Sequence, residues 1–297
     1  MEIMPMNRFR LSITPLAREL QTPTPPGGVL STLSGEYNTI FKGAGLEFRD
    51  FRLYGPTDPA KMIDWKASLK ADRIVIREYE EERNAEVLFC VDVSSGMIFG
   101  SGKLKNHYCA EFVVSLGKHI LEANDAVGLL TFTEKITTFV SPTLGLSQLS
   151  ILIDVLSSFS TYGGGSDFKK LFDFLEGGVL EGTTLILVSD FFNFKKYKKY
   201  ERTLHVLRSK FEIIFVILRD PVEDFFTPKQ KQVLLKSPQK NKSILITPSK
   251  IRKRYVLETR KEKLQFINYL KTVDIPVMEL YTDRSFVEPL YEFFAGT

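Results

Sequence analysis

The stretch VLFCVDVSSG, residues 87–96, is the part of this chain that indicates its fold most clearly. It opens with five apolar residues, as expected for a strand that is covered on both faces of its sheet. The strand then runs into Asp92, Ser94 and Gly96. An acid and a hydroxyl two residues apart are oxygen donors of the kind that a hard cation prefers. The stretch therefore predicts a buried strand with a cation site on the loop that leaves it.

Strands and helices alternate from residue 86 onward. Apolar runs predict further strands at residues 126–132, 136–140, 183–189, 212–218 and 276–280. Helices are predicted at residues 103–123, 146–159, 167–175, 197–208, 260–271 and 285–294, the first of them from apolar residues spaced by four. This alternation is typical of an α/β fold, a doubly wound and mainly parallel sheet with helices on both faces.

The chain before residue 86 does not follow this pattern. Residues 1–34 contain the Pro/Gly-rich stretch TPTPPGG and predict an arm or linker, and residues 35–85 predict a small β-rich module. Residues 86–297 then form the α/β domain, with a basic insertion at about 219–257. Within this insertion, residues 229–254 hold nine Lys or Arg and no acid, and we expect a β-hairpin or loop there.

Composition excludes several classes of protein. With 43% hydrophobic and 26% charged residues the chain is an ordinary globular protein, and its formal charge of +4 is too small to indicate nucleic acid by itself. The three histidines are scattered and show no metal-ligand spacing. No apolar run approaches the ~20 residues of a membrane span, and the N-terminus lacks the apolar core of a secretory signal. With both cysteines in regular elements, the sequence predicts a cytoplasmic location without a membrane span.

Three loops are expected to meet at one cation. In a doubly wound sheet, ligands bind beyond the carboxyl ends of the strands where the strand order reverses. Asp92 and Ser94 follow one strand, Asp190 follows another, and Ser166 comes after three glycines that allow close backbone approach. These four residues predict a site for Mg²⁺ or Mn²⁺. The alternative is that Ser94, Ser166 or Asp167 caps the following helix and that Asp190 closes an ordinary turn.

The pattern Asp92-x-Ser94, then Ser166, then Asp190 resembles the metal-ion-dependent adhesion site of von Willebrand factor A-like domains, whose sheet is of the Rossmann type. That site usually reads DxSxS, whereas this chain has Gly96 at the second serine. The resemblance implies a protein-interaction module that binds a divalent cation, with weak or absent binding if Gly96 disables the site.

A longer resemblance covers most of the chain from residue 34 onward. Residues 34–83 resemble the block that precedes the A-like domain in domain-of-unknown-function family 58, and RDPVEDFF at residues 219–226 resembles a later segment of that family. The matching features of the block are Phe41-Lys42-Gly43, Gly45, Glu47-Phe48, Arg52, Tyr54, Asp58, Ile63-Asp64-Trp65 and Arg77-Glu78, with Thr57 replacing the usual glycine. The resemblance implies association with MoxR-type AAA+ ATPases, in metal insertion or protein-complex maturation.

These observations predict a non-catalytic, divalent-metal-dependent interaction module, an adaptor between a MoxR-type ATPase and a client whose acidic side chain completes the metal shell. Lys195 and Lys196, on the rim of the site, and Asp64 and Trp65 are candidate partner-binding residues. The alternative for the second pair is that Trp65 packs the small module onto the α/β domain while Asp64 pairs with a basic residue.

Two other functions remain open. The basic insertion would serve a metal-free scaffold or a nucleic-acid-binding protein, although it has few aromatic residues for stacking on bases. A metal-dependent phosphoesterase would need more clustered carboxylates than Asp92, Asp167 and Asp190 provide, and no general base stands out. We therefore expect no enzymatic activity.

Overall fold

A six-stranded sheet forms the centre of the protein. The computed structural model describes residues 9, 11–14, 48–55, 58, 63–79, 84–192, 194, 197–225, 233–236 and 243–295. The sheet has the order β10-β7-β6-β3-β4-β5, and only the edge strand β5 runs antiparallel to its neighbour. Its strands are β3 (Glu86–Asp92), β4 (Ala126–Phe132), β5 (Ile136–Thr143), β6 (Thr184–Ser189), β7 (Glu212–Arg219) and β10 (Val277–Tyr281). The predicted doubly wound, mainly parallel sheet is confirmed.

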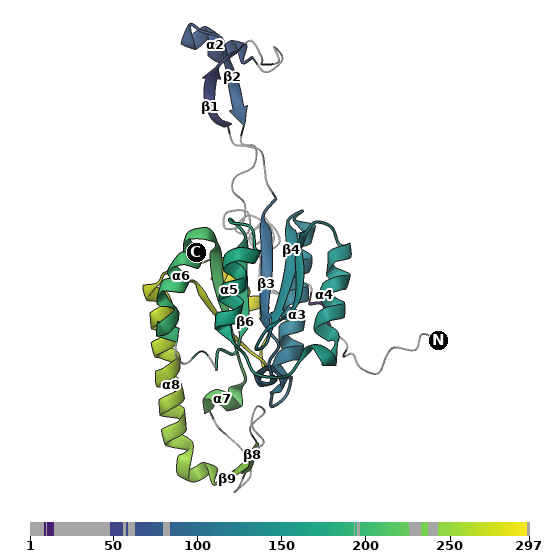
Figure 1. Cartoon of the computed structure of the whole chain (residues 1–297), viewed down its shortest axis with the longest axis vertical. Helices are drawn as coiled ribbons and strands as arrows, with labels where there is room; N and C mark the ends of the chain where they lie inside the picture. Colours follow the sequence, from purple (N-terminus) through teal and green to yellow (C-terminus); the bar gives the residue numbers. More distant parts are fainter. Residues whose placement is uncertain are drawn as a thin grey trace, which may run out of the picture.

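Helices cover both faces of this sheet (Figure 1). One face packs against α3 (Lys105–Glu122), α4 (Ser147–Ser157) and α9 (Val287–Ala295), and the other against α5 (Phe168–Gly178), α6 (Glu201–Lys210) and α8 (Pro248–Thr272). Along β3, Val87, Phe89 and Val91 enter the first core, whereas Leu88 and Cys90 enter the second. Because alternate residues point to opposite faces, a strand buried on both sides must be apolar throughout.

The second core is rich in aromatic rings. Phe168, Phe172 and Phe194 lie within 6.3 Å of one another between ring centroids, and Phe194 stacks on Tyr200 at 5.1 Å. Tyr200 ends the 3₁₀ turn η4 (Tyr197–Tyr200), so the predicted helix 197–208 is divided into η4 and α6. This cluster packs α5 against η4, the turn that leads into α6.

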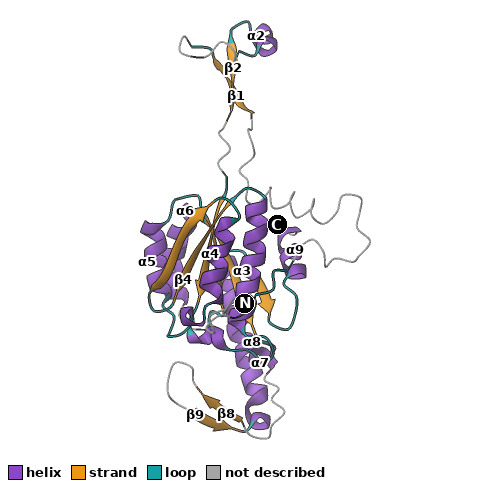
Figure 2. Cartoon of the chain, turned by 90° about the vertical axis from the view of Figure 1, so that its right-hand side faces the viewer, coloured by secondary structure: helices purple, strands orange, loops and turns teal. Residues whose placement is uncertain are grey.

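The N-terminal part contains a small antiparallel sheet. Strands β1 (Phe48–Leu53) and β2 (Val75–Tyr79) pair with each other, and helix α2 (Trp65–Ala71) lies between them in the sequence. Arg52 and Asp58, two of the residues that carry the family resemblance, are joined by two hydrogen bonds of 2.8 and 2.7 Å. The sheet lies apart from the central one (Figure 2). The domain limits at residues 34 and 85 stay a prediction.

A short piece of the N-terminal arm packs on α3 and on the end of α4. The amide of Phe9 donates to the carbonyl of Ser157 at 3.0 Å, and the amide of Thr14 donates to the Ser115 hydroxyl at 3.0 Å. The Phe9 ring lies 5.0 Å from that of His107 and 5.2 Å from that of Phe159. These residues of the arm therefore form part of the folded α/β body.

The basic stretch is partly a hairpin and partly a helix. Strands β8 (Val233–Lys236) and β9 (Ser243–Ile246) pair antiparallel, as expected for a hairpin. Helix α8 begins at Pro248, whereas the sequence predicted that it begins at residue 260. Proline is well suited to the first turn of a helix. Residues 251–254 are exposed, and only the later turns bury Phe266, Tyr269 and Leu270. Hydrophobic periodicity therefore detected only the packed half of the helix.

Candidate functional site

The strand order reverses between β3 and β6. From β3 the chain builds outward through β4 and β5, and from β6 it builds the other way through β7 and β10. Strands β3 and β6 are parallel neighbours, with Val91 opposite Val188. Their carboxyl ends therefore open at one edge, and the loops that begin with Asp92 and Asp190 leave the sheet side by side.

Asp92 is buried at this edge, with 1% of its surface exposed. Its Oδ1 accepts a hydrogen bond from the Ser94 amide at 2.9 Å, and its Oδ2 accepts one from the Ser189 hydroxyl at 2.7 Å. Burial, followed by the nearby Asp190 carboxylate, raises the pKa of Asp92 from 3.8 to about 6. The two acids are thus close enough to repel each other.

Asp190 is held from two sides. Its Oδ1 accepts from the Phe192 amide at 2.9 Å, and its Oδ2 accepts from the Lys105 ammonium at 2.7 Å. A Cβ atom built on Gly96 would lie 2.9 Å from that same Oδ2 and 3.7 Å from the Ser94 hydroxyl oxygen. Asp190, Ser94 and Gly96 therefore surround one point. A serine in place of Gly96 would collide with the Asp190 carboxylate as it lies here.

The glycine-rich loop adjoins the loop of Asp92. The Ser95 amide donates to the Gly164 carbonyl, and the Gly163 amide donates to the Val93 carbonyl, both at 2.9 Å. Gly163 and Gly164 have φ of 146° and 74°, which favour glycine. Ser166 lies half-buried further along this loop, and its place in a metal shell stays a prediction.

One of the alternative interpretations is confirmed at the next residue. Asp167 caps helix α5, because its Oδ1 accepts from the Lys169 amide at 2.9 Å. Ser94 stands at the corresponding position before the 3₁₀ turn η2 (Ser95–Ile98), but its side chain makes no capping hydrogen bond there.

Sequence reasoning missed the residues that complete the electrostatics of the site. Lys105, at the start of α3, is 1% exposed, and its ammonium also lies 2.7 Å from Glu223 Oε1. Burial alone would lower the pKa of Lys105, but the Asp190 and Glu223 carboxylates raise it above its usual value. Glu223 belongs to RDPVEDFF, so this motif was the available signal. A lysine that begins a helix gives no sign in the sequence that it is buried.

Asp220, in the same motif, holds the neighbouring loop through hydrogen bonds. Its carboxylate accepts hydrogen bonds from the Ser101 amide at 2.7 Å, the Ser101 hydroxyl at 3.1 Å and the Thr282 hydroxyl at 2.9 Å. Its own amide donates to Glu223 Oε2 at 3.0 Å. Asp220 therefore links the loop before Lys105 to the short helix α7 (Pro221–Phe225), which carries Glu223.

The oxygen atoms at this edge of the sheet could supply part of the coordination shell of a hard cation. Two carboxylates and a hydroxyl, from Asp92, Asp190 and Ser94, would suit Mg²⁺, which keeps several of its waters. Among the described residues, no group of three or more His, Cys, Asp or Glu side chains is placed to hold a metal ion, so hydroxyl and water oxygens would have to fill the shell. Lys105 already supplies one positive charge to Asp190. Any divalent ion here would share Asp190 with an ammonium.

Of the four candidate partner-binding residues, the structure describes Asp64 and Trp65. Lys195 and Lys196 fall outside the described residues. Asp64 caps α2 by accepting from the amides of Lys66 and Ala67, both at 3.0 Å. Trp65 is 65% exposed, so the alternative that it packs the small module onto the α/β domain is wrong.

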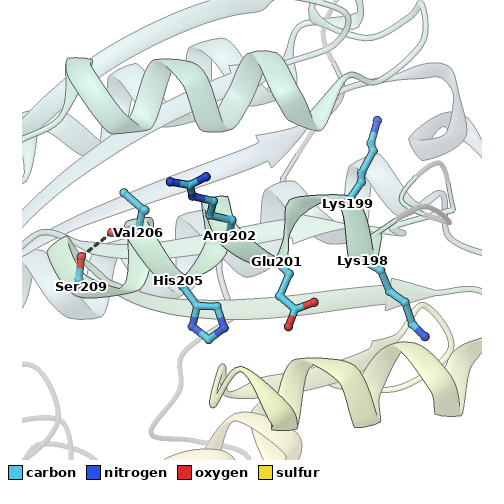
Figure 3. Close-up of a pocket in the computed structure, with 7 residues that line it drawn as sticks. All are labelled: Lys198, Lys199, Glu201, Arg202, His205, Val206 and Ser209. Carbon is cyan, nitrogen blue, oxygen red and sulfur yellow. Dashed lines mark hydrogen bonds between the residues drawn. The ribbon is translucent and has the colours of Figure 1, made fainter.

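A shallow depression also lies on η4 and α6 (Figure 3). None of the proposed metal ligands lines it; the lining residues are Lys198, Lys199, Glu201, Arg202, His205, Val206 and Ser209.

Comparison with known families shows to which family the chain belongs. The family model described as "Protein of unknown function DUF58" matches residues 50–265, and the chain belongs to this family. Its curated relatives include the uncharacterized protein Rv1480 of Mycobacterium tuberculosis and the uncharacterized protein Mb1516 of Mycobacterium bovis. Each is 20% identical over 272 residues, which cover 89% of this chain and 83% of the relative.

Several solved structures are similar to this chain at low identity. BatB from Bacteroides thetaiotaomicron is 12% identical with a TM-score of 0.44, and the match covers 72% of this chain and all of that one. The VWA domain of SpRpn10 is 11% identical with a TM-score of 0.33, covering 46% and 76% of the two chains. The α/β fold class of this chain rests on the strand order of its own central sheet and not on these similarities.

The prediction of a cytoplasmic location is contradicted, because two of the similar solved structures are named as membrane proteins. One is an aerotolerance-related membrane protein from Bacteroides fragilis, 13% identical with a TM-score of 0.43 over 72% of this chain and all of that one. Another is an uncharacterized membrane spanning protein from Vibrio fischeri. Within the described part of this chain, no helix combines the length and apolarity needed to cross a bilayer.

Proposed function

We propose that this chain is a non-catalytic protein-interaction module whose binding edge is formed by the loops after β3 and β6. The observation that carries the proposal is the convergence of Asp92 and Asp190, two buried acids that repel each other at the switch point of the sheet. A divalent cation, Mg²⁺ or Mn²⁺, would relieve this repulsion. Asp92, Ser94, Ser166 and Asp190 are the proposed ligands, and an acidic side chain of a partner would complete the shell.

The proposed partner is a MoxR-type AAA+ ATPase, with a client protein bridged to it. This part of the proposal rests on the family to which the chain belongs, because the resemblance to that family implies association with such ATPases. Purified chain and the MoxR-type ATPase of the same organism should co-elute in size-exclusion chromatography with Mg²⁺. They should separate in EDTA or when Asp92 is replaced by alanine. Co-elution that ignores both changes would refute the metal-dependent form of the proposal.

Metal binding by the chain itself is tested by thermal unfolding. A ligand that binds only the folded state raises its stability in proportion to the logarithm of its concentration. Millimolar Mg²⁺ or Mn²⁺ should therefore raise the melting temperature, and Asp92→Ala should abolish the rise. As a control, Asp173→Ala removes an exposed carboxylate that pairs with Lys169 on α5 and should leave the rise intact. No rise in the unmodified chain would refute a metal-dependent function of that chain at these metal concentrations.

A metal-free scaffold is the second candidate, and the Lys105 ion pair favours it. The ammonium already offsets one of the clustered negative charges, and Gly96 removes a hydroxyl that the adhesion site usually has. In this case the same edge binds its partner without a cation. Partner binding that persists in EDTA, together with a melting temperature unaffected by Mg²⁺, would select this candidate.

A further inference from the structure

Lys105 is buried, and both its backbone amide and its side-chain ammonium make hydrogen bonds. Its amide donates to the Phe99 carbonyl at 2.8 Å, and its ammonium contacts Asp190 Oδ2 and Glu223 Oε1, each at 2.7 Å. The Lys105 side chain is 1% exposed, compared with 7% for Asp190 and 20% for Glu223. Because desolvated charges require partners, this lysine belongs to the site and is not a solvated surface residue.

The surroundings hold the ammonium where it is. Glu223 is oriented by the Asp220 amide, which donates to its second oxygen at 3.0 Å. Asp220 in turn holds Ser101, in the loop that leads into Lys105. The ammonium therefore has an anchor, Glu223, that lies outside the proposed metal shell. It keeps a partner even when a metal ion takes the Asp190 oxygen.

Lys105 and a metal ion would use the same oxygen. The Asp190 Oδ2 that accepts from Lys105 is also the atom nearest to the Gly96 position, beside the Ser94 hydroxyl. A cation coordinated between Asp92, Ser94 and Asp190 would compete with the ammonium for this oxygen and would be repelled by its charge.

We propose that Lys105 is the resident cation of this site and that the Lys105–Glu223 pair sets its affinity for divalent metal. The inference rests on the proposed function, because it assumes that Asp92 and Asp190 bind the metal. With Lys105 in place, binding is weak and the protein is folded without metal. With the ammonium removed, a divalent ion takes its place as the counter-charge of Asp190.

The test compares Mg²⁺ and Mn²⁺ binding, measured by titration calorimetry, in the unmodified chain and in the Lys105→Met variant. Removal of the ammonium should tighten binding at least about tenfold. Lys105→Met should also melt at a lower temperature in EDTA, since Asp190 loses its partner, and millimolar Mg²⁺ should restore more of its stability than it adds to the unmodified chain.

Two variants control for folding and for charge. Lys105→Met combined with Glu223→Gln removes the buried pair together, so a folded protein remains for titration if the single variant fails to fold. Lys103→Met removes the same charge two residues earlier, from a lysine that pairs with Glu111 and not with the site, and should leave metal affinity unchanged.

The outcomes separate this inference from the proposed function. Tighter binding only in the Lys105 variants supports it. Equal binding in the unmodified chain and the Lys105 variants overturns it but leaves the metal-dependent module intact. Absence of binding in all of them overturns both.

Discussion

Replacing Asp92 by asparagine should stabilise the metal-free protein at neutral pH. The amide is nearly the same size, and its oxygen can still accept from the Ser94 amide, as Oδ1 does at 2.9 Å. Its nitrogen cannot accept from the Ser189 hydroxyl, as Oδ2 does at 2.7 Å, so one hydrogen bond worth about 1 kcal/mol is lost against the gain worked out next. The change removes the ionised group whose pKa rises from 3.8 to about 6 through burial and the Asp190 charge. Since each tenfold change in acidity corresponds to ~1.4 kcal/mol, the charge on Asp92 costs the folded state about 3 kcal/mol at neutral pH.

The difference in unfolding free energy between Asp92→Asn and the unmodified chain should change with pH only over a defined range. Below about pH 3.8 the carboxyl is protonated in both the folded and the unfolded chain, so the charge penalty is absent. Between about 3.8 and 6 the folded chain keeps a proton that the unfolded chain has lost, and rising pH therefore favours unfolding. Above about 6 the penalty is complete. The advantage of Asp92→Asn should grow across this window and then level off.

Urea unfolding in EDTA, repeated at a series of pH values, measures this difference. Comparing the two proteins at each pH cancels the contribution of every other titrating group that the substitution leaves unchanged. The relief of the repulsion between Asp92 and Asp190 is already part of the expected gain, because the Asp190 charge is one cause of the raised pKa. A free-energy difference that does not vary with pH, or an asparagine variant that is less stable at neutral pH, would refute the reasoning.

Substitutions at three further positions test other parts of the structure. Gly96→Ser should lower the free energy of unfolding in EDTA by about 1–3 kcal/mol, because its Cβ would meet Asp190 Oδ2 at 2.9 Å, and urea unfolding should show the loss. Phe172→Ala should cost about 3–5 kcal/mol in the same assay, since the ring is 1% exposed within the aromatic core; a loss below about 1 kcal/mol would contradict that packing. Asp167→Ala should cost about 1 kcal/mol by removing the cap of α5, whereas Asp167→Asn should retain most of the stability.

Much of the fold was accessible from local sequence because buried strands are apolar along their whole length. The strand predicted at residues 126–132 coincides with β4, and the strand predicted at 87–91 lies within β3. The least accurate limits are those of α8, whose residues 251–254 are exposed and include three charged side chains. Exposed helical turns carry no hydrophobic period, so neither periodicity nor composition distinguished them from a loop.

The sequence by itself determined the alternation of strands and helices, and with it the expectation that Asp92 and Asp190 leave neighbouring strands at one edge. The surroundings of these acids, in contrast, become known from the folded structure alone. Lys105 lies 85 positions from Asp190 and 118 from Glu223, and their contacts arise because the sheet order brings α3, the loop after β6 and the loop after β7 together. Periodicity is a property of near neighbours in the chain, whereas the compensation of a buried charge depends on which distant loops share the same edge of the sheet.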